Sequence, residues 1–269
     1  MMKRLFLILL MANMISQYAM AQNPIKYPST RTVNQVDEYF GVKVADPYRW
    51  LEDDNSAETE QWVKAQNQVT QAYISKIPFR NALKDKMMAL QNYEKCGIPF
   101  KHHGKYFFYK NNGLQNQSVL YEMDSLDGTP REVLDPNTLS DDGTVALQSV
   151  DFSKDGRYMA YTISRSGSDW NEIYVKDLST GELLPDHIVW AKFTNAQWQG
   201  DGFYYSAYDA PERELSSKNE YQKVYYHKLG TPQSQDELVF RSFEEPLMFH
   251  MAYVSEDERF VYMLSLIHI

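Results

Sequence analysis

The residue types that enzymes use for chemistry occur in this chain, but their spacing matches no familiar reaction motif. The sequence has no Gly-x-Ser-x-Gly turn for a serine nucleophile, no glycine-rich phosphate loop and no His-Glu-x-x-His pair. The carboxylate pairs Asp53-Asp54 and Asp141-Asp142 fall at a helix start and in a turn, where capping and hydration account for them. The residues alone therefore assign no catalytic group.

Metal, cofactor and nucleic-acid binding are also disfavoured. Among the histidines only His102 and His103 are close in sequence, and neighbours on a strand point to opposite faces. The net charge is −9, from 27 basic and 36 acidic residues that are spread along the chain, so a phosphate backbone would be repelled. We predict no metal site, no cofactor and no nucleic-acid partner.

The composition is that of a globular protein held together by packing. The chain is 43% hydrophobic and 23% charged. Cys96 is the one cysteine, so no disulfide can form within the chain. A lone cysteine is most often a small buried hydrophobe, and we expect Cys96 to be one.

The elements that must position any functional residue follow a repeated pattern. The stretch SKDGRYMAY (153–161) is echoed by QGDGFYYSAY (199–208) and SEDERFVYM (255–263), and more faintly by KHHGKYFFY (101–109). Each copy is a polar turn that leads into an aromatic strand, at intervals of about 45 to 57 residues, which is typical of four-stranded propeller blades. A β-sandwich with scattered hairpins is the alternative.

The region from 93 to 263 reads as strands throughout, which predicts a mainly β fold of about three and a half blades. The expected strands are 106–110, 117–123, 131–134, 146–152, 157–164, 171–177, 182–184, 196–199, 203–208, 222–228 and 237–241. A further unit starts at Met251 and contains a strand at 260–263.

The residues before this region, 22–92, form an extended stretch and two amphipathic helices. Prolines at 24, 28 and 47 argue against a helix in the extended part. The helices are predicted at 56–76, capped by Asn55 with Glu58 three residues on, and at 79–92. Two helices cannot close a core, so we expect them to need a partner surface elsewhere.

Both ends of the chain carry features of another kind. Residues 1–21 have the order of a secretory signal, with Lys3 and Arg4, an apolar run and a small-x-small site before Gln22. We expect cleavage after Ala21 and a periplasmic or secreted protein without membrane attachment; an uncleaved anchor is the alternative. Residues 264–269, LSLIHI, resemble a translated sequencing-library adapter. We expect the natural sequence to diverge there and continue, so that His268 carries no chemistry.

Several stretches resemble the prolyl oligopeptidases, serine peptidases in which a propeller covers an α/β-hydrolase domain. The DPYRWLED stretch is shared with the related oligopeptidase B group, whereas GLQNQ and DPNTLSDDGTVAL are more specific to the prolyl branch. The resemblance extends to about Met263. The matching stretches are DPYRWLED (46–53), AQN (65–67), GLQNQSVLY (113–121), LDPNTLSDDGTVAL (134–147), SGSDW (166–170) and YYHKLGT (225–231).

The resemblance implies a fold and an activity. The fold would be an incomplete seven-bladed β-propeller, preceded by a helical segment that packs on an α/β-hydrolase domain absent from this chain. The parent enzyme would be a monomeric serine endopeptidase that cleaves short proline-containing peptides after proline through an acyl-enzyme, with the propeller gating access. The family's Ser, Asp and His lie beyond this chain, so no catalytic residue is carried over and the chain alone is expected to be inactive.

The resemblance also implies three site residues. Phe193, in AKFTNAQW, matches a propeller phenylalanine that borders the pocket for the residue two before the cleaved proline; a core aromatic is the alternative. Phe249, in EEPLMFH, matches a second pocket residue, with Met248 adjacent. Asp169, in SGSDW, matches an acid that faces the domain interface, with a plain turn role as the alternative.

Other functions stay open at this point. An oligopeptidase B-like enzyme would cleave after Arg or Lys, and a propeller-bearing exopeptidase belongs to the same superfamily. A non-catalytic binding propeller is a third possibility, against which stands the lack of WD-type repeats in the sequence.

Overall fold

The computed structural model describes residues 25–212 and 217–266. The chain divides into two compact units, Met1–Met87 and Met88–Ile269, and the division falls within a helix. The expected signal segment, 1–21, lies outside the described residues, as do 213–216 and 267–269. No helix in the described ranges is long and apolar enough to cross a membrane.

The first unit contains a hairpin that the sequence did not indicate. Strands β1 (Val36–Tyr39) and β2 (Val42–Ala45) pair antiparallel where a purely extended segment was expected. The turn residues Phe40 and Gly41 both have positive φ, 54° and 82°, which is the two-residue turn that suits the twist of a hairpin. Phenylalanine rarely adopts this backbone conformation, which explains why no turn was predicted.

The DPYRWLED motif continues from this hairpin into a short helical turn, η1 (Arg49–Glu52). The Arg49 guanidinium bonds the carboxylates of Asp46 and Asp37, and so ties the motif to β1. The Trp50 indole donates to the Arg31 carbonyl oxygen at 2.9 Å, which fastens the preceding segment as well. The motif therefore joins η1 to β1 and to the segment that contains Arg31.

Two helices follow at the predicted places, α2 (Ala57–Ile74) and α3 (Arg80–Gln91). The predicted cap is wrong: Ser56, and not Asn55, caps α2, because its hydroxyl accepts the Thr59 amide at 3.1 Å. The side-chain partner of the capping residue is Thr59, whose hydroxyl accepts from the Ser56 hydroxyl, and not Glu58 as expected. Glu58 instead pairs with Arg31. Large apolar side chains are exposed on both helices, namely Val63, Tyr73, Leu83, Met87, Met88 and Leu90.

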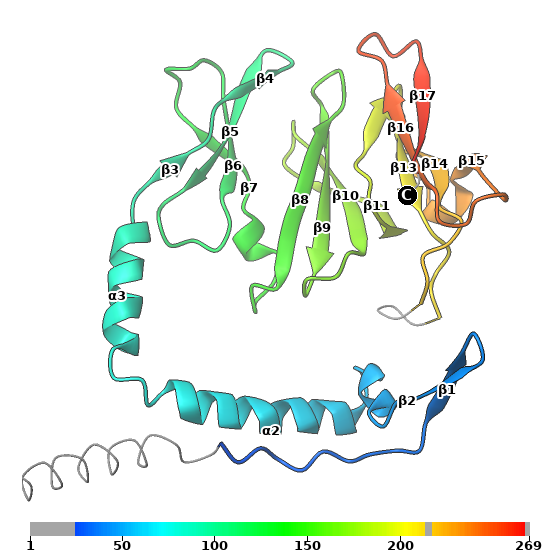
Figure 1. Ribbon diagram of the computed structural model, residues 1–269. Helices are drawn as coiled ribbons and strands as arrows, with labels where there is room; N and C mark the ends of the chain where they lie inside the picture. Colours follow the sequence, from blue (N-terminus) through cyan, green and yellow to red (C-terminus); the bar gives the residue numbers. More distant parts are fainter. Residues whose placement is uncertain (1–24, 213–216, 267–269) are drawn as a thin grey trace, which may run out of the picture. The chain divides into compact units, whose positions relative to one another are not determined.

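The second unit is a row of antiparallel sheets in chain order, which Figure 1 shows standing next to one another. In the first sheet the short strands β3 and β4 both pair with β5, which continues to β6 and β7. This is a four-strand meander whose first strand is interrupted. The bounds are β3 (Lys95–Cys96), β4 (Phe100–His102), β5 (Lys105–Asn111), β6 (Val119–Met123) and β7 (Arg131–Leu134).

Two complete meanders follow, and then a hairpin. A single pair, Ala191 with Ala207, joins the second meander to the third. The bounds are β8 (Val145–Phe152), β9 (Tyr158–Arg165), β10 (Asn171–Asp177) and β11 (Leu183–Ala191); β12 (Gln197–Gln199), β13 (Gly202–Ala207), β14 (Lys223–Lys228) and β15 (Glu237–Arg241); then β16 (Phe249–Val254) and β17 (Val261–Leu266). Short helical turns lie at η2 (Pro136–Thr138) and η3 (Gln233–Gln235).

These strands confirm most of the predicted strands, with three differences. Strand β11 runs to Ala191 and is much longer than the expected 182–184, because Pro185 interrupted the sequence pattern. The last unit begins at Phe249, before Met251. Its second strand includes Leu264, Ser265 and Leu266, which pair with β16.

The core lies between neighbouring sheets, as a stack of propeller blades requires. One cluster joins the first meander to the second and another joins the second to the third. Ile173, Ile188 and Phe203 are fully buried in the latter, and burying each such side chain stabilises the fold by about 1.5 to 3 kcal/mol. Packing of this kind confirms the propeller prediction over a two-layer sandwich.

Cys96 contradicts its prediction. It lies on the short edge strand β3 and is exposed, not buried. The strand has only one paired neighbour, β5, and no sheet covers its outer side among the described residues. Composition could not indicate this, since burial depends on what packs over the strand.

Candidate functional site

Each blade has two ends, and the repeated turns mark one of them. The four repeated turns follow the first strands β4, β8, β12 and β16, and those after β8 and β16 lie at the top of Figure 1. The residues that enter β12 and β16 lie at the opposite end. Phe193 precedes β12 and Phe249 begins β16, so both belong to that opposite end, which we call the Phe193 end.

The two predicted pocket residues are in contact. The rings of Phe193 and Phe249 meet edge to face, with centroids 5.0 Å apart, a favoured aromatic geometry. Phe193 is 43% exposed, so it is not the core aromatic that was its alternative. Sequence matching had placed them 56 residues apart on separate motifs; the structure joins them because β12 and β16 are neighbouring first strands. Their role in substrate binding stays a prediction.

Phe193 has an unusual backbone. Its φ is 54°, in the left-handed region that bulky residues avoid, and Trp190 three residues earlier has φ 59°. Such conformations cost about 1 to 3 kcal/mol each and persist where the surroundings fix them. The chain between β11 and β12 is therefore held in a shape that turns the Phe193 ring outward.

Asp169 faces the same end from the turn between β9 and β10. Its side chain is 71% exposed, and its carboxylate lies 3.6 Å from the Lys192 ammonium. Lys192 is itself buried, and its ammonium lies over the rings of Trp170 and Phe193, 4.8 Å and 5.5 Å from their centroids. Asp169 is thereby connected to Phe193 through Lys192.

A hollow of about 470 Å³ brings these residues together. Asp169 and Phe193 both line it. The remaining walls are small or polar and come from β8, β9, the β9–β10 turn, the start of β10 and the loop before β12, namely Ala146, Gln148, Ser149, Ser164, Gly167, Ser168, Asn171 and Thr194. An aromatic ring, a carboxylate and several hydroxyl and amide groups suit a peptide in extended form.

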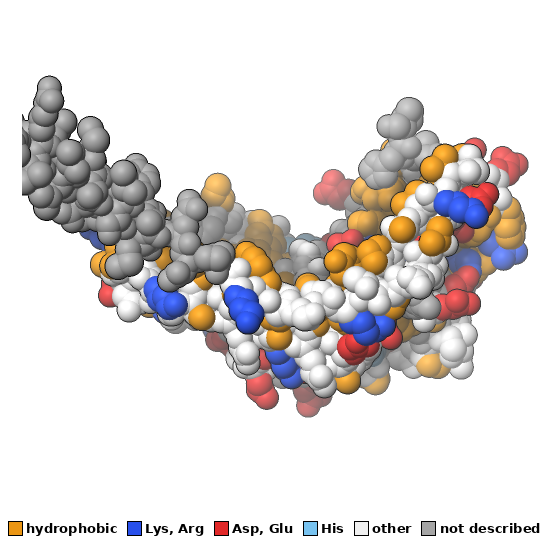
Figure 2. Space-filling view, turned by 60° about the horizontal axis from the view of Figure 1, so that its bottom comes forward, with side chains coloured by type: hydrophobic (Ala, Val, Ile, Leu, Met, Phe, Trp, Pro, Cys, Tyr) orange, Lys and Arg blue, Asp and Glu red, His pale blue; other side chains and the backbone are white. Residues whose placement is uncertain are grey.

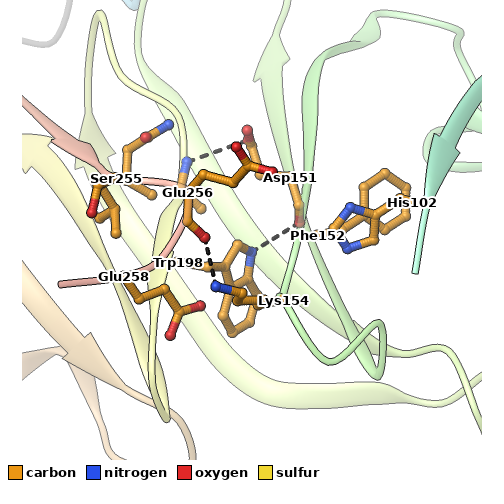
Figure 3. Close-up of a pocket in the computed structure, with 11 residues that line it drawn as sticks. His102, Asp151, Phe152, Lys154, Trp198, Ser255, Glu256 and Glu258 are labelled. Atoms are coloured by element: carbon orange, nitrogen blue, oxygen red, sulfur yellow. Dashed lines mark hydrogen bonds between the residues drawn. The ribbon is translucent and has the colours of Figure 1, made fainter.

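A second hollow, of about 370 Å³, lies at the other end, where the repeated turns converge. Figure 3 shows its wall, to which the three meanders and the last hairpin contribute, with His102, Asp151, Trp198 and Glu256 among the labelled residues. The Lys154 ammonium donates to the Glu256 carbonyl oxygen at 2.5 Å. This bond links the second sheet to the last hairpin.

Asp151 is the most constrained acid of this second hollow. Burial raises the pKa of its carboxyl, while hydrogen bonds from Asn195, Ser149 and the Ala196 amide oppose the rise. Its own carbonyl oxygen accepts the Trp198 indole at 2.9 Å. Its side-chain hydrogen bonds go to its own strand and to the residues just before β12. Asp151 therefore joins two blades and has no geometry for acid–base chemistry on a ligand.

No described group of side chains assembles a nucleophile, a base and an acid. His250 approaches the Ser265 hydroxyl at 2.8 Å, but its other ring nitrogen has no partner within the described ranges. His227 contacts two carboxylates, Asp186 and Asp236, and no hydroxyl nucleophile. The described part of the chain also contains no cluster of three or more metal-ligating side chains.

Charged side chains are also dispersed over the surface. Figure 2 shows basic and acidic side chains interspersed with apolar ones on the face in view, without a continuous basic area. The described residues thus form a hollow at the Phe193 end and assemble no catalytic group.

Comparison with known proteins identifies the relatives of this architecture. The family model described as "Prolyl oligopeptidase, N-terminal beta-propeller domain" matches residues 27–269. The chain belongs to the prolyl oligopeptidase family. It is 47% identical over 247 residues to the prolyl endopeptidase of Elizabethkingia miricola, covering 90% of this chain and 35% of that enzyme. Prolyl oligopeptidase A of Amanita bisporigera is 36% identical over 279 residues, covering 90% of this chain and 36% of the relative.

Solved structures of prolyl oligopeptidases have the same fold. Prolyl oligopeptidase B from Galerina marginata, bound to a 25mer macrocyclization substrate, matches with a TM-score of 0.77 at 33% identity, over 91% of this chain and 38% of that one. A structure from a study of two prolyl endopeptidases matches with a TM-score of 0.60 at 38% identity, over 90% of this chain and 35% of that one. This chain thus holds an incomplete propeller and spans about a third of the length of these oligopeptidases.

Sequence reasoning missed the residue at the centre of the Phe193 end. Lys192 stands directly before Phe193 in the quoted motif, yet a lysine in a polar segment is normally solvated. Trp190, two residues earlier, was also passed over. The available signal was the run Trp-Ala-Lys-Phe, in which an apolar surrounding for the lysine could have indicated a buried cation.

Proposed function

We propose that this chain is the propeller-bearing N-terminal part of a serine endopeptidase that cleaves short peptides after proline. The single observation that carries the proposal is the close identity to the Elizabethkingia prolyl endopeptidases over nearly the whole chain. The exposed Phe193 ring supports it, because this ring lines a hollow, is packed against Phe249 and offers an apolar surface to the side chain of a bound peptide.

The proposed reaction is acyl transfer by groups outside this chain. A serine hydroxyl attacks the carbonyl carbon of the proline, a histidine accepts its proton and passes it to the amine of the leaving residue, and water then releases the prolyl acyl group. Structures of the Galerina enzyme, solved with a serine, a histidine or an aspartate replaced by alanine, support the serine type. This chain would contribute a wall of the substrate pocket, and its blades would restrict access to short peptides.

The proposal extends to location and assembly. The segment 1–21 would direct export and be removed after Ala21, which leaves a periplasmic or secreted monomer. Intact-mass measurement of the exported protein should give a chain that starts at Gln22. A mass that includes the first 21 residues would contradict export by a cleaved signal.

Two experiments test the activity. Sequencing the source gene beyond the codon for Met263 should find several hundred further residues, with a Gly-x-Ser-x-Gly turn followed by Asp and then His. The enzyme expressed from that gene should cleave an N-blocked Gly-Pro-p-nitroanilide and lose this activity with a serine-reactive organophosphate. Residues 22–263 alone should be inactive. Cleavage after Arg or Lys in place of proline would assign the enzyme to the oligopeptidase B group.

A further inference from the structure

Lys192 is a buried cation at the Phe193 end. Only 8% of its side chain is accessible. Within the described ranges its one ion pair is with Asp169, at 3.6 Å, which is longer than a hydrogen bond. Its ammonium is stabilised mainly by the faces of Trp170 and Phe193, at 4.8 Å and 5.5 Å from the ring centroids.

The backbone of Lys192 is fixed as firmly as its side chain. Its amide donates to the Ser206 carbonyl oxygen at 3.4 Å, and its carbonyl oxygen accepts the Gln222 side-chain amide at 2.8 Å. Gln222 is fully buried, and its side-chain oxygen Oε1 accepts the His250 backbone amide at 2.7 Å. Lys192 is thus anchored between the strands β13 and β16, and Phe193 follows it with φ 54°.

These contacts form a chain from one wall of the hollow to the other. Asp169 and Phe193 both line the hollow, and the Lys192 ammonium, which does not line it, contacts both. Cation–π attraction is stronger where the cation is desolvated. The buried ammonium therefore favours the ring orientation in which it lies over the face of Phe193.

We propose that Lys192 is a positioning residue that sets the preference for the side chain two positions before the cleaved proline, by holding the Phe193 ring. The inference rests on the proposed function and names a determinant of its specificity. Lys192 does not line the hollow itself, so it acts through Phe193 and Asp169 and not on the peptide.

The test compares two substrates on the enzyme that contains this chain and its hydrolase domain. Acetyl-Phe-Gly-Pro-p-nitroanilide places a ring at the position in question, and acetyl-Gly-Gly-Pro-p-nitroanilide places none. In Lys192→Met the volume is kept and the charge removed. We expect KM for the phenylalanine substrate to rise about fivefold with kcat unchanged, and both constants for the glycine substrate to change by less than about twofold.

Two further variants separate positioning from mere folding. Lys192→Arg keeps the cation over the rings and should restore the preference for the phenylalanine substrate. In Phe193→Ala the ring is already absent, so adding Lys192→Met should have no further effect on KM. Phe193 is exposed, so Phe193→Ala should fold. If Lys192→Met does not fold, Lys192→Arg carries the test, and loss of the phenylalanine preference in that folded variant overturns the positioning role.

The outcomes distinguish failure of the positioning role from failure of the proposed function. If wild-type enzyme cleaves both substrates and Lys192→Met weakens both equally, or if the effects of the two substitutions add, the positioning role is overturned and the peptidase function stands. If wild-type enzyme cleaves neither substrate, the proposed function fails and the inference fails with it.

Discussion

At the scale of single residues, His227 is the most completely enclosed ionisable side chain that the structure describes. Its two ring nitrogens bond the carboxylates of Asp236 and Asp186, at 2.7 Å and 3.0 Å, and its side chain has no accessible surface. The Tyr205 hydroxyl donates to Asp236, and the Gly230 amide donates to Asp186. Both ring nitrogens face acceptors, so the geometry favours the imidazolium.

The charge of His227 makes stability depend on pH. Burial lowers its pKa, but the hydrogen bonds and charges of Asp236 and Asp186 outweigh burial, and the pKa is raised above its ordinary value. The stabilisation is therefore complete below about pH 6.5, the ordinary pKa in the unfolded chain, and is lost as the pH rises through the folded pKa. We expect His227→Gln to lower the Tm of the whole enzyme by more at about pH 6 than at about pH 9, as measured by scanning fluorimetry.

His250 supplies a control of opposite sign. Burial lowers its pKa, so its contribution is present above the unfolded pKa and lost as the pH falls through the folded pKa. The Tm loss in His250→Gln should then be greater at about pH 8 than at about pH 5. A Tm loss in His227→Gln that is the same at every pH would mean that the imidazolium has no special role.

At the scale of elements, glutamine side chains make the hydrogen bonds that a neighbouring strand would make at the edge of a blade. Gln233, in η3, accepts the Val189 amide and donates to the Val189 carbonyl oxygen, both at 3.0 Å. It thus occupies the place of a strand beside β11. Gln117 does the same at the start of β8, with the Leu147 amide at 2.8 Å and the Val145 carbonyl oxygen at 2.7 Å. Blades are joined in this way without sharing a strand.

Loss of such a bridge should destabilise the propeller measurably. Gln233→Ala leaves the amide and carbonyl of Val189 without their partner, and each unsatisfied buried group costs about 1 to 3 kcal/mol. We expect a drop of several degrees in the Tm of the whole enzyme. Gln235→Ala, in the same helical turn but exposed, is the matched control and should have almost no effect. Equal effects of the two substitutions would rule out the bridge.

At the scale of the whole molecule, the described chain leaves apolar surface and a strand edge uncovered. Strand β17 pairs only with β16 in the described part of the chain, and Tyr262, Leu264 and Leu266 on it are exposed. The helices α2 and α3 add exposed apolar side chains of their own. Open edges and apolar patches favour association between copies.

We therefore predict that residues 22–263, produced alone, self-associate. Size-exclusion chromatography with light scattering should give species heavier than the monomer, and Tyr262→Lys, which places a charge on the exposed edge strand, should reduce their share. The enzyme with its hydrolase domain should elute as a monomer. A fragment that is monomeric and melts cooperatively would contradict this prediction.

Local signals in the sequence were sufficient for most of the elements and for the type of fold. Polar turns before aromatic strands recur because each blade repeats one hairpin geometry, and periods of 2 and 3.6 residues identify strands and helices without any distant contact. The Phe40-Gly41 hairpin, the Ser56 cap and the exposure of Cys96 were missed. The first needs a backbone conformation that phenylalanine rarely adopts, the second a choice between adjacent polar residues, and the third knowledge of the neighbouring sheet.

By itself, then, the sequence determined the order of helices and strands, the propeller repeat and the motifs that assign the chain to its family. Only the tertiary structure brought Phe193 to Phe249, enclosed Lys192 between two rings and buried His227 between two carboxylates. The physical reason is that periodicity reports how a residue relates to its own strand, whereas burial and charge pairing depend on which blade packs beside it. Which blade packs beside a residue depends on many individually weak contacts that are distributed along the whole chain.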